Sequence, residues 1–141
     1  MAITSAICSS FKQQILVEGH NLTNGADSIK LALYTSSATL GAGTTVYVTT
    51  GQATGTNYSA GGNALTNVTP ALSGTTAMCD FADLTFGTAT VTARGCLLYN
   101  ATNGNKALCA IDFGGDKTST AGDFTVVFPS ATATGAIIRL A

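Results

Sequence analysis

The chain has 141 residues, of which only 9% are Asp, Glu, Lys or Arg, whereas about 25% is usual in a soluble domain. Its length fits one domain, residues 1–141, and its formal net charge of −1 comes without the basic clusters that bind nucleic acid. No apolar run approaches the roughly 20 residues that cross a bilayer. We therefore expect neither a nucleic-acid nor a membrane partner, and a weakly charged surface that favours association with other proteins.

The first 19 residues predict one amphipathic helix, because four apolar residues recur at a spacing of four. The members of this stripe are Ile3, Ile7, Phe11 and Ile15. Thr4 or Ser5 is a candidate N-cap and Gly19 suits the C-terminal end, which gives a helix over about residues 5–18. The segment lacks the basic start of a secretory signal, so we expect synthesis in a cytoplasm.

After Gly19 the apolar residues recur with a period of two, which predicts strands. The first expected strand covers residues 29–34 and has one apolar face. The others cover residues 46–48, 64–68, 77–84, 90–99, 107–113, 123–128 and 136–140. Asn103-Gly104 is the strongest hairpin signal, and 114–116 (Gly-Gly-Asp) predicts a further turn. Seven or eight short strands without helical crossovers predict a mainly β fold, an antiparallel sandwich, jelly roll or barrel with one N-terminal helix.

Residues 49–63 differ from the rest of the chain. They are Gly, Thr, Ser and Asn for the most part, around Tyr58. The segment is too polar for a core and long enough to form an arm or binding loop.

The residues that could carry chemistry do not form a recognisable catalytic pattern. His20 is the one histidine, it follows a helix-ending glycine, and no Gly-x-Ser-x-Gly motif surrounds any serine. A solvated turn histidine is the simpler interpretation. We expect no enzyme activity, no catalytic residue and no cofactor.

Structural roles are also the simpler interpretation of the cysteines and aspartates. The four cysteines (Cys8, Cys79, Cys96 and Cys109) contain no Cys-x-x-Cys pair, so we expect free buried thiols, with a Cys96–Cys109 disulfide across the hairpin as the alternative. Asp112, Asp116 and Asp123 could together hold a calcium ion, but capping of turns is the commoner role of such residues. We expect no metal site.

Seven segments carry a resemblance that extends in order over nearly the whole chain. They are residues 11–16 (FKQQIL), 29–38 (IKLALYTSSA), 55–62 (GTNYSAGG), 81–83 (FAD), 93–95 (ARG), 112–114 (DFG) and 136–139 (AIIR). Together they resemble a family of small virion proteins of tailed bacteriophages, frequent in cyanophages. The resemblance implies a structural virion component with a β-sandwich or barrel and an N-terminal helix, and it carries over no catalytic residue.

The leading hypothesis is therefore a capsid decoration (cement) protein on the capsid surface of a virion, synthesised in the cytoplasm of the host bacterium. Its expected partners are the major capsid protein, other virion proteins and copies of itself, in a symmetric oligomer such as a trimer. One alternative is a tail or baseplate component. Another is a carbohydrate-binding module for host attachment, with Tyr47, Tyr58 and Tyr99 as sugar contacts.

The candidate interface consists of the helix stripe and two tyrosines: Ile3, Ile7, Phe11, Ile15, Tyr47 and Tyr58. Packing inside the chain is the alternative role for the helix, and a solvated excursion is the alternative for residues 49–63.

Overall fold

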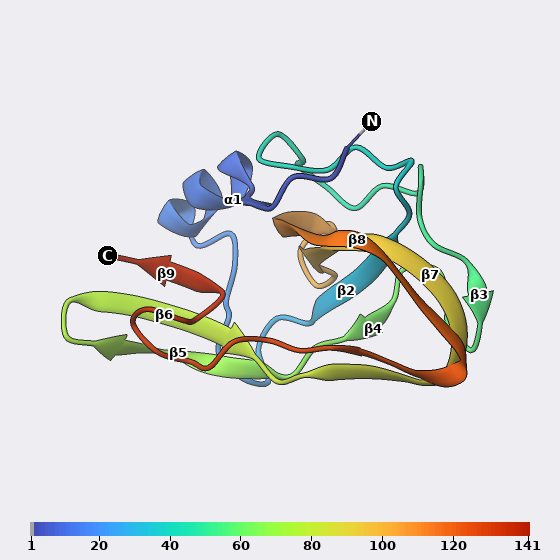
Figure 1. The fold of residues 1–141 in the computed structure, drawn as a ribbon. Coiled ribbons are helices and arrows are strands. Elements are labelled where there is room, and N and C mark those ends of the chain that lie inside the picture. The colour runs from blue at the N-terminus through green and yellow to red at the C-terminus, as the bar shows by residue number, and fades with distance from the viewer. Residues whose placement is uncertain (1) are drawn as a thin grey trace.

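A computed structural model describes residues 2–141 and shows two antiparallel sheets with a short helix near the N-terminus (Figure 1). The six-stranded sheet has the order β1-β8-β7-β2-β4, and β3 pairs with β7 beside this path. The three-stranded sheet has the order β5-β6-β9. The elements are β1 (Ala6–Ile7), α1 (Ser9–Gln14), the 3-10 helix η1 (Ile15–Val17), β2 (Ile29–Tyr34), β3 (Gly55–Thr56), β4 (Asn63–Ala64), β5 (Asn67–Ser73), β6 (Thr76–Phe81), β7 (Leu84–Asn100), β8 (Lys106–Val126) and β9 (Ile138–Leu140). The mainly β prediction is confirmed, and the described sheets do not close into a barrel.

The fold is built on the long hairpin of β7 and β8, which have 17 and 21 residues. The predicted Asn103-Gly104 turn joins them, and Asn100 pairs with Lys106 at its base. Both strands curve strongly along their length (Figure 1). The hairpin prediction is therefore confirmed.

The predicted break in the second half of the chain is wrong. Residues 107–113 and 123–128 lie on one continuous strand up to Val126, not on two strands separated by a turn at 114–116. Ala93 pairs with Lys117 and Gly95 with Asp112, so residues 113–116 bulge opposite a single residue of β7. Gly114 has a φ of 81° and supplies the conformation that this bulge needs.

The core lies around β2, which runs between β7 and β4. The sequence predicts that only one face of this strand is buried. In the structure both faces are buried, because Ala32 and Tyr34 are as fully buried as Leu31 and Leu33. Residues 49–63 are attached to this strand at several points, while most of their side chains are exposed. The N–H of Ala53 donates to the carbonyl of Leu33 at 2.9 Å, and the Leu33 N–H donates to the Tyr58 hydroxyl at 2.7 Å.

The N-terminal helix is much shorter than predicted. Residues 9–14 are α-helical and residues 15–17 continue as a 3-10 turn, whereas Ile7 lies in β1 opposite Cys109 and Ile3 bridges to Leu40. A spacing of four also places residues on one face of an extended chain, so the pattern fits both structures. The N-cap position is Cys8, not Thr4 or Ser5. Pairing with β8 satisfies the backbone groups that a longer helix would have used.

A buried polar network fastens the end of the helix to the hairpin turn. The Asn100 side chain is fully buried, and its oxygen accepts hydrogen bonds from the N–H groups of Thr102 and Asn103, both at 3.1 Å. Its nitrogen therefore donates, to Asp27 at 2.7 Å and to Nδ1 of His20 at 3.0 Å.

This network determines the tautomer of the histidine. Since Nδ1 of His20 accepts, Nε2 carries the proton and donates to Gln14 Oε1 at 2.8 Å. Burial lowers the pKa of His20, which agrees with a neutral ring.

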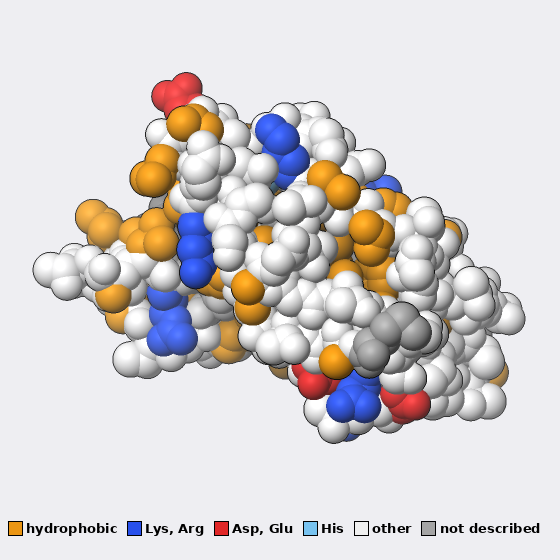
Figure 2. Space-filling model, turned by 90° about the horizontal axis from the view of Figure 1, so that it is seen from above, with side chains coloured by type: hydrophobic (Ala, Val, Ile, Leu, Met, Phe, Trp, Pro, Cys, Tyr) orange, Lys and Arg blue, Asp and Glu red, His pale blue; other side chains and the backbone are white. Residues whose placement is uncertain are grey.

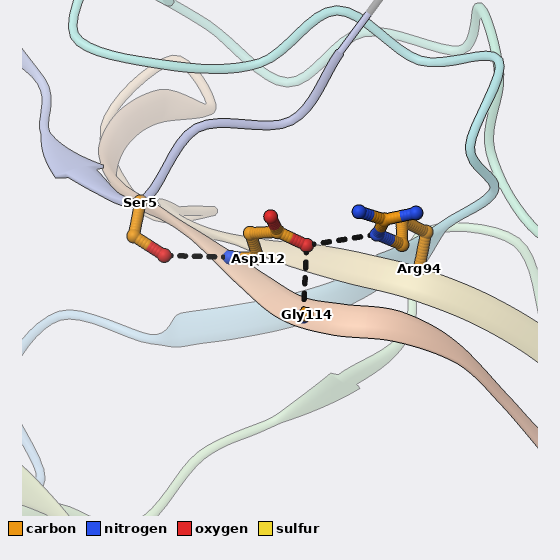
Figure 3. A network of polar contacts seen from close by, with 4 residues as sticks. All are labelled: Ser5, Arg94, Asp112 and Gly114. Carbon is orange, nitrogen blue, oxygen red and sulfur yellow. Dashed lines mark hydrogen bonds and ion pairs between the residues drawn. The ribbon is translucent and has the colours of Figure 1, made fainter.

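A second network ties the N-terminal segment to the bulge (Figure 3). The N–H of Asp112 donates to the Ser5 hydroxyl at 2.8 Å, and Oδ1 of Asp112 accepts from Gly114 at 2.9 Å and from Arg94 at 3.0 Å. These two bonds, with the backbone donor as the larger contribution, lower the pKa of Asp112. Arg94–Asp112 is the one ion pair of residues 2–141.

Candidate assembly surfaces

The groups considered for chemistry have structural partners. His20 belongs to the network at the end of the helix. The carboxylate of Asp123 accepts a hydrogen bond from the backbone N–H of Thr88 at 3.1 Å. Asp112 pairs with Arg94, and residues 2–141 contain no cluster of three His, Cys, Asp or Glu side chains that could hold a metal ion. The three aspartates considered for calcium therefore do not converge.

The cysteines are free thiols and all four are buried, as the favoured interpretation of the sequence predicts. Burial raises the pKa of Cys8 and Cys79 to about 11 and that of Cys109 to about 12. The pKa of Cys96, at the centre of β7, is raised well above its ordinary value for the same reason. Such thiols are protonated near neutral pH and are poor nucleophiles.

One carboxyl is buried without a full set of partners. Asp80 on β6 is 1% exposed, and its Oδ1 accepts the N–H of Phe81 at 2.9 Å. Burial raises the pKa of Asp80. The Cys79 thiol donates only to the backbone carbonyl of Asp80, at 4.0 Å, and no described histidine or cation forms a hydrogen bond with the carboxyl, so the arrangement does not constitute an acid–base pair.

The predicted interface residues lie largely inside the chain. Ile3, Phe11 and Tyr58 are 6%, 2% and 7% exposed, so in the described chain they hold the fold together. The remaining three, Ile7, Ile15 and Tyr47, are partly buried and pack against the core. Packing inside the chain was the alternative role considered for the helix.

The tyrosines considered for sugar binding are likewise not arranged as an open platform. Tyr47 stacks on Tyr99 with ring centroids 4.7 Å apart, and Tyr58 meets Phe86 edge to face at 5.1 Å. Tyr99 is 3% exposed.

Two strongly exposed apolar side chains lie in the 3-10 turn that follows the helix. Leu16 and Val17, which we call the knob, are 83% and 64% exposed. The 3-10 turn directs them away from the core that Phe11 contacts. Burying an exposed Leu or Val contributes about 1.5–3 kcal/mol, so the knob is a strong candidate contact. Its signal in the sequence is an apolar pair that continues past the helical stripe.

A shallow apolar groove lies between the helix and the three-stranded sheet. This helix–sheet groove has a volume of about 300 Å³, and Phe11, Ile15, Met78 and Leu140 are among its lining residues. Leu140 on β9 is 52% exposed, and Leu72 on the other outer strand, β5, is 74% exposed. Figure 2 shows hydrophobic side chains gathered at the left-hand end of the molecule, where α1 and the small sheet lie.

A larger apolar hollow lies within the curve of β8. This hairpin cavity has a volume of about 530 Å³, within the range of ligand and side-chain pockets. Its lining includes Ile111, Phe113, Phe124, Val126, Phe128 and Ile137. Val127 at its edge is 72% exposed, and Lys117 and Asp123 are its charged lining residues. Ile137 lines this cavity, and the next residue, Ile138, lines the helix–sheet groove. The two hollows therefore lie on opposite sides of the backbone at residues 137–138.

No described helix is long and apolar enough to cross a membrane. In comparisons with known proteins no family model matches the chain, and no curated protein and no solved structure gives a significant match.

Proposed function

We propose that this chain is a non-enzymatic structural protein of a phage virion, a capsid decoration protein that stabilises the head through contacts with the major capsid protein. The observation that carries the proposal is the combination of uncovered aliphatic side chains with few charges. Leu16, Leu72 and Leu140 are each more than half exposed, in a chain with only 13 acidic and basic side chains. Apolar side chains that gather at one end of a surface mark a contact site.

We assign the capsid contact to the end formed by the three-stranded sheet. Leu72 and Leu140 lie on its two outer strands, and the helix–sheet groove lies beside them. Leu72 and Leu140 are 74% and 52% exposed, so covering both would contribute about 2–4 kcal/mol in total. Many such copies on a lattice add enough contact area to resist internal pressure.

The number of copies per particle tests this function. Quantitative mass spectrometry of purified virions should give a count comparable with that of the major capsid protein. About a dozen copies would instead indicate a tail or baseplate component, since such rings contain few subunits. Absence from the particles would overturn the virion assignment.

A binding assay tests the surface itself. Purified chain is added to particles that lack it, and bound protein is measured after sedimentation. Leu72→Ser and Leu140→Ser should each weaken binding, whereas Val46→Ser, at an exposed valine away from the small sheet, should bind like the unchanged chain. Equal binding by all three variants would exclude the small-sheet end as the contact.

A further inference from the structure

The knob and the hairpin cavity are complementary surfaces that do not meet within one chain. Leu16 and Val17 project from the end of the helix, and neither lines the cavity. The cavity is apolar, concave and unfilled by the described residues, whereas the knob is apolar and convex. A protrusion and a hollow on different parts of one molecule can meet each other only between two copies, in a heterologous contact.

The hollow has room for the knob. The cavity volume of about 530 Å³ is large enough for two aliphatic side chains, and Phe113, Phe124 and Phe128 are among its lining residues. Phe113 and Phe124 lie with ring centroids 6.3 Å apart at an angle of 46°, which leaves ring faces available to an aliphatic partner. A buried apolar anchor in a pocket of this kind is the usual centre of a protein–protein contact.

The charges beside the two parts allow one ion pair across the contact. Glu18 directly follows the knob and is exposed, and Lys117 lines the cavity. Neither has an ion-pair partner among residues 2–141. Asp123 also lines the cavity, and its carboxylate accepts a hydrogen bond from the Thr88 N–H. Lys12 lies in α1, the helix that precedes the knob. Each side therefore offers one charge of each sign, so the surfaces can approach without net repulsion.

We infer that copies of this chain associate head to tail, with Leu16 and Val17 of one copy seated in the hairpin cavity of the next and Glu18 facing Lys117. The contact is heterologous, so repeating it produces a closed ring where the rotation between copies closes, and a filament where it does not. This inference deepens the proposed function and rests on its assembly role. It does not depend on which virion protein the oligomer covers.

Sedimentation velocity over a wide range of concentration provides the first test. The unchanged chain should form a species larger than a monomer. Leu16→Ser and Val127→Asp should each lower the association constant about tenfold or more, as loss of a central contact does. All the altered positions are exposed, so the fold should persist, and circular dichroism checks this. Val46→Ser is the control, at an exposed valine that belongs to neither the knob nor the cavity lining, and should associate normally.

Mixing two defective variants tests the head-to-tail arrangement. A chain with Leu16→Ser and Val17→Ser keeps its cavity, and a chain with Val127→Asp keeps its knob. Each should be monomeric alone, and the mixture should form a dimer of one copy of each that grows no further. Self-association of the Val127→Asp chain alone would indicate a symmetric contact and overturn the inference.

Exchange of the charges tests the register of the contact. Glu18→Lys and Lys117→Glu should each weaken association, and the chain with both changes should recover it to within about twofold. Failure of the double variant to recover would show that the two residues do not meet.

These outcomes separate the inference from the proposed function. A chain that binds particles but remains monomeric refutes the knob-to-cavity contact alone. A chain that associates through these surfaces but is absent from virions refutes the virion assignment alone.

Discussion

Replacement of Asn100 by alanine should be among the most destabilising polar substitutions in this chain. The side chain is fully buried and takes part in four hydrogen bonds. Alanine removes all four hydrogen bonds at once. Two backbone N–H groups, the Nδ1 atom of His20 and the carboxylate of Asp27 then lack the partner that Asn100 provides. The end of the helix and the hairpin turn would lose their shared anchor.

The magnitude follows from the types of bond. Each neutral bond contributes about 1 kcal/mol, and the bond to the carboxylate contributes about 2 kcal/mol. Thr102 is exposed and Asp27 is half-buried, so water replaces part of what is lost. We therefore expect the free energy of unfolding to fall by about 3 kcal/mol, a large part of the 5–15 kcal/mol that is typical of a whole domain.

Urea unfolding measures this loss, with tyrosine fluorescence as the signal because the chain has no tryptophan. With a slope of about 1–3 kcal/mol per molar urea, the midpoint should fall by at least about 1 M. Asn63→Ala is the control, since Asn63 is exposed and its side chain makes no hydrogen bond within residues 2–141, and it should change stability by less than about 0.5 kcal/mol. A loss below about 1 kcal/mol for Asn100→Ala would refute the network as the anchor of the helix end.

Three further predictions concern pH, backbone space and thiols. Burial lowers the pKa of His20 in the folded state, so the unfolded chain binds the proton more readily. The contribution of His20 to the free energy of unfolding should be complete above about pH 6.5 and decrease as the pH falls below it. In urea titrations, His20→Gln should remove this contribution to the pH dependence of stability. Gly62→Ala should destabilise the fold by more than about 3 kcal/mol, because a Cβ there would lie 1.6 Å from the carbonyl oxygen of Leu31. Gly104→Ala, also at positive φ but with nothing within 4 Å, should cost only about 1 kcal/mol in the same assay. A thiol reagent should leave all four cysteines unmodified in the native protein and label all four after unfolding; rapid labelling of the native chain would contradict their burial.

Local patterns in the sequence predict several strands and the main hairpin correctly, since alternation and turn residues act over a few positions. Two expected strands differ in the structure: residues 46–48 contribute only an isolated bridge at Val46, and residues 64–68 span the end of β4 and the start of β5. Residues 29–34 form a strand with the expected limits, and Asn103-Gly104 lies in the turn that joins β7 to β8. The Gly-Gly pair at 114–115 shows where this reasoning fails. A glycine pair allows a chain reversal or a bulge equally well, and the choice depends on pairing with β7, which is a long-range interaction.

The candidate surfaces were harder to predict for a related reason. Tyr58 lies in a polar segment, yet its hydroxyl and the backbone around it bind β2, so it is buried. Leu16 belongs to an apolar run, yet the tightening of the helix into a 3-10 turn exposes it. The exposure of each side chain therefore depends on long-range contacts or on helix geometry, and neither can be predicted from the amino-acid composition of the segment.

The pairing of β1 with β8 has a consequence for the order of folding. The hairpin of β7 and β8 closes a loop of only five residues, 101–105, whereas Ala6 pairs with Ala110 far along the chain. Closing the longer loop costs about 2.5 kcal/mol more in chain entropy, by the logarithmic dependence on length. The hairpin should therefore form early, and the N-terminal segment should dock last, on an edge that is already complete. During synthesis residues 6–7 leave the ribosome long before their binding site on β8 exists, so the part of the chain that carries the knob acquires its final position only after β8 has been made.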